Sequence, residues 1–217
     1  MQDTKQLFLW YGANDYETHQ KLLAWSKAFE KKYSNLNVYY FDGNEGGKDK
    51  LLGGLKNALQ VNSLFGMNKL IIIKNLLVKG KVDDTLKELL LKSLDNVQPG
   101  FFVVFSQAEK PDTRTAVFKK IKALEKKGLA EIQEFKLPQS FQLTKWIEKI
   151  AKQEKVQIDS KAMNVLSALV GNDLWQLASE IKKLANYKVQ IAEEDVNFLV
   201  KGKYNDDIFQ LMDAISA

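Results

Sequence analysis

Short β-rich runs alternate with helical patterns over the first 137 residues of the chain. The runs fall at residues 7–11, 38–41, 70–73, 101–105 and 130–135. Apolar side chains recur at helical spacing between them, at residues 15–33, 48–59, 83–94 and 113–127. Continuous apolar strands separated by helices are typical of a parallel sheet covered on both faces. The pattern therefore predicts an α/β domain with a doubly wound parallel five-stranded sheet.

The pattern changes after Leu137-Pro138. Amphipathic helices then follow one another at residues 141–152, 159–170, 173–187 and 193–200. Asp159, and either Asn172 or Asp173, stand just before two of these helices, where a side-chain oxygen can cap the first turn. We therefore expect domain 1–137 to be hinged to a small helical lid domain at 138–205.

Residues 206–217 again place apolar side chains on one helical face. Within the sequence they have no following element to pack against. We interpret this stretch as the start of a truncated C-terminal domain.

The net charge of +5 is unevenly distributed. Residues 1–137 carry 22 basic and 16 acidic side chains, and residues 138–217 carry 10 and 11. The basic residues are lysines except for Arg114, and lysine distinguishes bases less well than arginine does. Two interpretations stay open: a solvated lysine-rich surface, or a sequence-independent contact with the DNA backbone.

Composition favours a cytoplasmic protein. The chain has no cysteine, which excludes disulfides and thiolate metal sites. It has no apolar run near the roughly 20 residues that cross a bilayer. The first ten residues lack the basic region and long apolar core of a secretory signal.

The loop after the first strand tests for a nucleotide site, because ligands of such sheets bind beyond the carboxyl ends of the strands. A phosphate-binding loop reads GxxxxGK[ST]. Here residues 11–17 read Tyr-Gly-Ala-Asn-Asp-Tyr-Glu, with Gly12 but no second glycine, lysine or hydroxyl. Asp15 and Glu17 would repel phosphate. We expect no ATP hydrolysis and no bound cofactor.

Other catalytic patterns are also missing. His19 is the only histidine, which excludes a multi-histidine metal site within the chain, and we interpret it as a surface residue. No serine lies in a GxSxG setting. Paired carboxylates stand where helices are expected to begin, where the helix dipole favours negative charge, at residues 83–84, 193–194 and 206–207. The sequence predicts a non-catalytic protein.

One connecting segment resembles a contact site. Ser63, Leu64, Phe65, Gly66 and Met67 lie between an expected helix and an expected strand, on a connection that should run over the surface. An adjacent Leu-Phe pair on a loop can fill an apolar pocket on a partner. From spacing alone, both side chains could instead fold back onto the domain's own core.

The order of several short motifs resembles the delta subunit of bacterial DNA polymerase III, the clamp-loader delta family of the AAA+ superfamily. The likeness spans nearly the whole chain, and no single motif is diagnostic. The motifs fall at residues 11–16, 41–43, 63–66, 70–73, 146–147, 171–184, 194–196 and 208–215. Two positions depart from the family pattern: Trp175, where arginine is frequent, and Ala192, where a capping threonine is usual.

The resemblance implies an AAA+ fold without a working ATP site. It implies that Leu64 and Phe65, flanked by Ser63, Gly66 and Met67, insert into a pocket on the sliding clamp (beta) and open its ring. It further implies assembly with ATPase subunits and a delta-prime subunit, mainly through a C-terminal collar domain, and work on primed DNA within the polymerase holoenzyme. The competing hypotheses are a degenerate P-loop ATPase, a stand-alone DNA-binding module and a generic scaffold.

Overall fold

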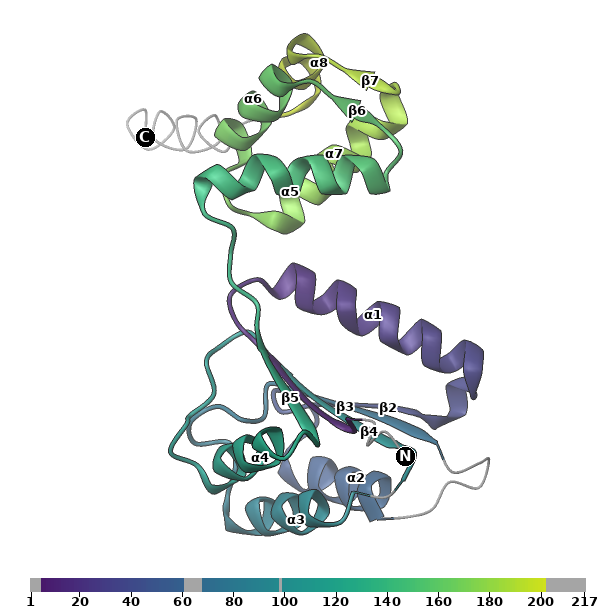
Figure 1. Ribbon diagram of the computed structural model, residues 1–217, viewed down its shortest axis with the longest axis vertical. Coiled ribbons are helices and arrows are strands. Elements are labelled where there is room, and N and C mark those ends of the chain that lie inside the picture. The colour runs from purple at the N-terminus through teal and green to yellow at the C-terminus, as the bar shows by residue number, and fades with distance from the viewer. Residues whose placement is uncertain (1–4, 61–67, 98, 202–217) are drawn as a thin grey trace, which may run out of the picture. The chain divides into compact units, whose positions relative to one another are not determined.

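The computed structural model describes residues 5–60, 68–97 and 99–201. The chain divides into two compact units, Met1–Lys136 and Leu137–Ala217 (Figure 1). The stretch at 206–217, interpreted from sequence as the start of a further domain, lies outside the described residues.

The first unit is built on a parallel sheet. Its strands are β1 (Leu7–Tyr11), β2 (Val38–Asp42), β3 (Lys69–Lys74), β4 (Phe101–Gln107) and β5 (Ala130–Glu134). Its helices are α1 (Asp15–Lys32), the 3₁₀ turn η1 (Asn35–Asn37), α2 (Lys48–Gln60), α3 (Asp84–Asp95) and α4 (Ala116–Lys126). The strand order is β2-β3-β4-β1-β5, and every neighbouring pair is parallel. The predicted α/β class with a five-stranded parallel sheet is confirmed.

Helices cover both faces of this sheet. Figure 1 shows α1 on one face and α2, α3 and α4 on the other. Side chains alternate accordingly along β1, since Leu7 and Leu9 pack with the three-helix core while Phe8 and Trp10 pack toward α1. Burial on both sides is the reason that the strand sequences are continuous apolar runs rather than alternating ones.

Large rings allow a single helix to cover its face. Phe8 and Trp10 of β1 meet Trp25 of α1 edge-on, at ring-centre distances of 4.5 and 5.1 Å. Phe135, just after β5, packs against Trp10 at 6.5 Å. Edge-to-face pairs of this kind add to the apolar area that the rings bury.

Helix α2 is intrinsically weak, because Gly53 and Gly54 lie in its middle. A glycine inside a helix costs about 1 kcal/mol relative to alanine. A Cβ at Gly54 would lie 2.7 Å from the ring of Phe41, so this glycine lets the helix approach β2 closely. Gly53 faces open space. The helix therefore depends on tertiary contacts, among them those of the buried Leu55 and Ala58.

The second unit is helical. It contains α5 (Ser140–Gln153), α6 (Ser160–Val170), α7 (Leu174–Tyr187) and α8 (Glu193–Leu199), with a two-residue parallel ladder between β6 (Gln157–Ile158) and β7 (Gln190–Ile191). Asp159 and Asp173 accept hydrogen bonds from the backbone N–H groups of Ala162 and Gln176, so both predicted N-caps are confirmed. At Ala192 the side chain of Asp195 instead accepts a hydrogen bond from the Ala192 N–H, at 2.7 Å.

The structure corrects two details of the sequence prediction. Helix α4 was expected from residue 113, but it begins at Ala116 because Asp112 and Thr115 form a turn and the Thr115 hydroxyl caps the helix. The turn η1 and the β6–β7 ladder were not predicted, since elements of two or three residues are too short to show a periodicity.

Candidate functional site

The carboxyl edge of the parallel sheet is where a ligand would be expected to bind. Strands β1 and β4 are neighbours there, and both end at this edge. Gly12 follows β1 directly and donates its N–H to the carbonyl of Gln107, the last residue of β4, at 3.1 Å. The loop after β1 is therefore bonded to the end of the adjacent strand.

Gly12 is also pressed against the segment that follows β5. Its φ is +129°, and a Cβ at this position would lie 2.2 Å from the carbonyl oxygen of Phe135. The N–H of Phe135 donates to Tyr11 O at 2.7 Å, and the N–H of Asn14 donates to Phe135 O at 3.0 Å. Only glycine fits here, and the reason is close packing of the backbone.

Asn14 closes the start of α1 from within the chain. It is 1% exposed, and its Oδ1 accepts the N–H of Glu17 at 3.0 Å. Its Nδ2 donates to Glu17 Oε2 at 3.1 Å and to the Lys136 carbonyl at 3.3 Å. A phosphate-binding loop leaves the amide donors at this end of the helix to its ligand. Here the N–H groups of Gly12, Asn14 and Glu17 are all committed to protein oxygens.

The loops after β2 and β3 are joined in a similar way. Asn75, with φ +52°, donates its Nδ2 to both carboxylate oxygens of Asp42 at 3.2 Å. Lys81 Nζ donates to the Asn75 carbonyl at 3.0 Å, and Gly43 N–H donates to Lys74 O at 2.8 Å. These polar groups hold one loop to another, and that structural role accounts for their placement.

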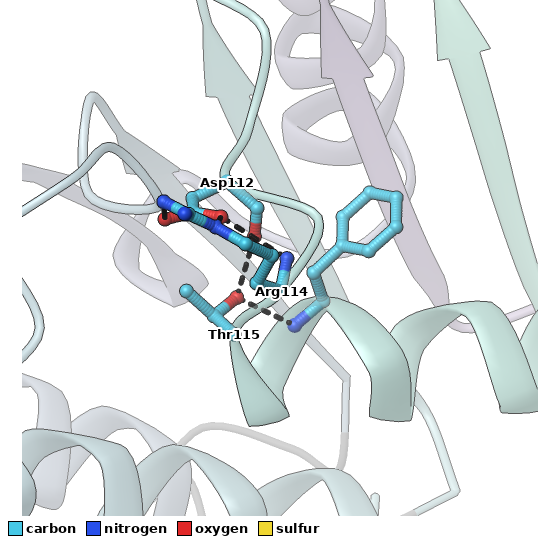
Figure 2. A network of polar contacts seen from close by, with 4 residues as sticks. Asp112, Arg114 and Thr115 are labelled. Carbon is cyan, nitrogen blue, oxygen red and sulfur yellow. Dashed lines mark hydrogen bonds and ion pairs between the residues drawn. The ribbon is translucent and has the colours of Figure 1, made fainter.

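The only arginine of the chain belongs to a fixed turn at the start of α4, which Figure 2 shows. Arg114 donates its backbone N–H and Nε to Asp112 Oδ1, both at 3.0 Å, and its Nη2 to Oδ2 at 2.9 Å. Thr115 Oγ1 donates to the Asp112 carbonyl at 2.8 Å and accepts the N–H of Phe118 at 3.2 Å.

The hydrogen bonds from Arg114 lower the pKa of Asp112 to about 2, and the same pairing raises the pKa of Arg114. The Arg114 side chain is 79% exposed, yet its charge is balanced by the neighbouring carboxylate. This guanidinium is therefore held in place at the surface with two of its donor groups already used.

The lysines of α4 differ in their availability. Lys120 pairs with Asp95, and Lys122 pairs with Glu125. Lys119, Lys126 and Lys127 are exposed at the start, end and C-cap of the helix. The basic surface of this helix is thus partly neutralised.

His19, expected at the surface, is half-buried on α1. Burial and the nearby Lys74 lower its pKa, against an opposing effect of Asp15. The imidazole is therefore neutral near pH 7. Among the described residues, no cluster of three or more metal-ligating side chains occurs. Within the same part of the chain, no helix has the length and apolar character that a membrane crossing requires.

The predicted contact residues Ser63, Leu64, Phe65, Gly66 and Met67 lie outside the described residues. The chain leaves α2 at Gln60 and enters β3 at Lys69. It thus enters β3 at the amino edge of the sheet, opposite the edge of the Gly12 loop. Lys69, the first residue of β3, is buried, and the sequence analysis did not single it out. Its position directly before the apolar run 70–73 is the only sequence feature that could have indicated this burial.

Family models match segments of both units. A family model described as DNA polymerase III, delta subunit, matches residues 8–131, and one described as a middle domain matches residues 142–198. No curated protein matches the chain in sequence.

Solved structures share the fold. The Bacillus subtilis DNA clamp loader delta protein YqeN is similar with a TM-score of 0.66 and 23% identity, over 98% of this chain and 63% of that protein. RuvB of Thermotoga maritima is similar with a TM-score of 0.57 and 12% identity, over 89% of this chain and 60% of RuvB. The chain thus spans less than two thirds of either protein.

We predict that Gly12→Ala strongly destabilises the first unit, by more than about 3 kcal/mol, since it combines an unfavourable φ with a backbone overlap. Gly128→Ala is the matched control, because Gly128 has φ +78° but open space around its Cβ. That control should cost only about 1 kcal/mol. Urea unfolding of both variants measures the difference, and equal losses would contradict the packing at Gly12.

We predict that Arg114→Gln raises the pKa of Asp112 from about 2 toward the usual carboxyl value of about 3.9. Because the folded-state pKa is depressed, the pair stabilises the fold above pH of about 4 and ceases to do so as the pH falls through about 2. Carboxyl ¹³C NMR titration measures the shift, with Lys110→Gln as the control. An unchanged Asp112 titration in Arg114→Gln would refute the pairing.

Proposed function

Because the chain belongs to the DNA polymerase III delta subunit family, we propose that it is a non-catalytic clamp-loader subunit that binds the sliding clamp and opens its ring. The observation that carries the non-catalytic part is the loop after β1. Its N–H groups at Gly12, Asn14 and Glu17 are bonded to the chain's own oxygens, at the position where a nucleotide-binding relative would hold phosphate.

Clamp binding is assigned to Leu64 and Phe65, with Ser63, Gly66 and Met67 flanking them. Burial of the two apolar side chains in a partner pocket contributes roughly 1.5–3 kcal/mol each. A partner that binds the open form of a ring more tightly than the closed form shifts it toward opening, and this requires binding energy rather than catalysis. A pair of adjacent apolar side chains on a connecting segment fits that requirement.

The remaining partners follow from the same assignment. We propose that the chain works with ATPase subunits and a delta-prime subunit on primed DNA in the bacterial cytoplasm. Domains 1–137 and 138–205 correspond to an AAA+-like domain and its lid, and 206–217 to the start of the collar domain through which the subunits assemble. ATP binding by those subunits then governs when the contact segment is available.

A contact with DNA is a second candidate function, which the exposed lysines of α4 favour. Lys119, Lys126 and Lys127 could neutralise backbone phosphates without reading sequence. Such binding would weaken steeply with salt and would not respond to Leu64→Ala. Binding to the clamp should instead depend little on salt and should weaken in Leu64→Ala.

We predict that Leu64→Ala/Phe65→Ala weakens clamp binding by about a hundredfold or more, since two buried anchors are lost. The matched control is Leu36→Ala/Phe198→Ala, which removes a leucine and a phenylalanine that are 58% and 77% exposed. Isothermal titration of each variant with the sliding clamp of the source organism measures the effect.

Two results would contradict the proposal: no binding by the wild-type chain, or equal binding by Leu64→Ala/Phe65→Ala. Titration of the wild-type chain with ATP distinguishes the proposed function from the competing ATPase hypothesis. Binding in the micromolar range or tighter would favour that hypothesis, and we expect none.

A further inference from the structure

Lys69, the first residue of β3, is buried although its side chain carries a charge. It is 1% exposed, and lysine is almost never fully buried without a partner. Burial lowers its pKa, since an apolar environment disfavours the charged form. A methionine of similar length could fill the space without that desolvation. The contribution of the ammonium group therefore lies in the groups that it contacts.

The ammonium group joins the end of α2 to the start of β3. Lys69 Nζ donates to the carbonyl of Ala58 at 3.2 Å. Ala58 lies in the last turn of α2, where carbonyls lack donors within the helix and the helix dipole favours a cation. The backbone N–H of Lys69 donates to Gly100 O at 3.0 Å, which adds a bond to the residue before β4.

Two aromatic rings also lie close to the ammonium group. Lys69 Nζ lies 4.8 Å from the ring centre of Phe101 on β4 and 5.5 Å from that of Tyr39 on β2. Both distances are within the range of cation–π attraction. The ammonium group is thus surrounded by contacts from β2, β4 and α2.

This contact matters because α2 is weak by composition. Gly53 and Gly54 lower its helix propensity, and Gly54 is required for the approach to Phe41. The last turn of such a helix is the part that frays first. Lys69 contacts the helix in that turn.

We propose that Lys69 is a positioning residue for clamp binding, which holds together the end of α2 and the start of β3, between which Leu64 and Phe65 lie in the sequence. Fixing the two residues at which a connection leaves the fold lowers the conformational entropy that binding through it costs, and thereby raises affinity. This inference rests on the clamp-binding function proposed above.

The first test is Lys69→Met, which keeps the length of the side chain and removes the ammonium group. We expect a folded chain whose affinity for the sliding clamp is weaker by roughly threefold to tenfold. Amide hydrogen exchange at residues 55–60 should become faster. Lys74→Met, at the other end of β3, is the matched control and should change neither quantity. Wild-type affinity in Lys69→Met would overturn the inference.

A rescue variant separates positioning from general damage. Gly53→Ala strengthens α2 at a position that faces open space. Added to Lys69→Met, it should restore part of the lost affinity and slow the exchange at residues 55–60. A loss of affinity that Gly53→Ala leaves unchanged would mean that Lys69 does not act through the end of α2.

Leu64→Ala/Phe65→Ala distinguishes this inference from the proposed function. If that variant binds the clamp as wild type does, the proposed function is wrong and the role of Lys69 falls with it. If it loses binding while Lys69→Met does not, only the role of Lys69 is wrong. If Lys69→Met does not fold, amide hydrogen exchange in the wild-type chain tests whether Lys69 stabilises the end of α2. Amides at residues 55–60 that exchange as fast as an exposed loop would refute the contact.

Discussion

Hydrogen bonding of β1 on both sides is the constraint on which the first unit depends. β1 lies between β4 and β5, in register with both, so that Leu9 pairs with Phe105 and with Ile132. A strand in that place is buried on both faces, and the loop that leaves it emerges between the ends of its two neighbours. Gly12 and Asn14 then find their hydrogen-bond partners at Gln107, the end of β4, and at Phe135, just beyond β5.

The carboxyl and amino edges of the sheet differ in their polar contacts. At the carboxyl edge, loops bond to loops: Asn14 donates to the Lys136 carbonyl and Asn75 donates to Asp42. The N–H of Asp112 likewise donates to the Leu77 carbonyl. At the amino edge of β3, the buried ammonium group of Lys69 links α2 to the strand. The fold alone does not assign a function, because similar sheets serve different proteins. The assignment of a function depends on the residues that the loops carry.

Much of the fold followed from sequence, and the exceptions have physical causes. The apolar runs predicted the strands because burial on both faces leaves no polar position within them. Asp159 and Asp173 were recognisable as caps because capping is local. The missing phosphate motif was visible in residues 11–17, but the approach of Gly12 to Phe135 joins residues far apart in the chain. Lys69 was missed because charge normally indicates exposure. The assignment of Leu64 and Phe65 to the clamp stays a prediction.

The capping of α1 by Asn14 has a thermodynamic consequence. A domain whose helix terminus is completed by a ligand gains stability from that ligand by mass action, and loosens when the ligand departs. Here the Asn14 side chain takes the place of such a ligand. Because it is part of the chain, its presence does not depend on the concentration of any ligand. Through this helix terminus, the folding free energy of the unit therefore does not depend on the binding of a nucleotide.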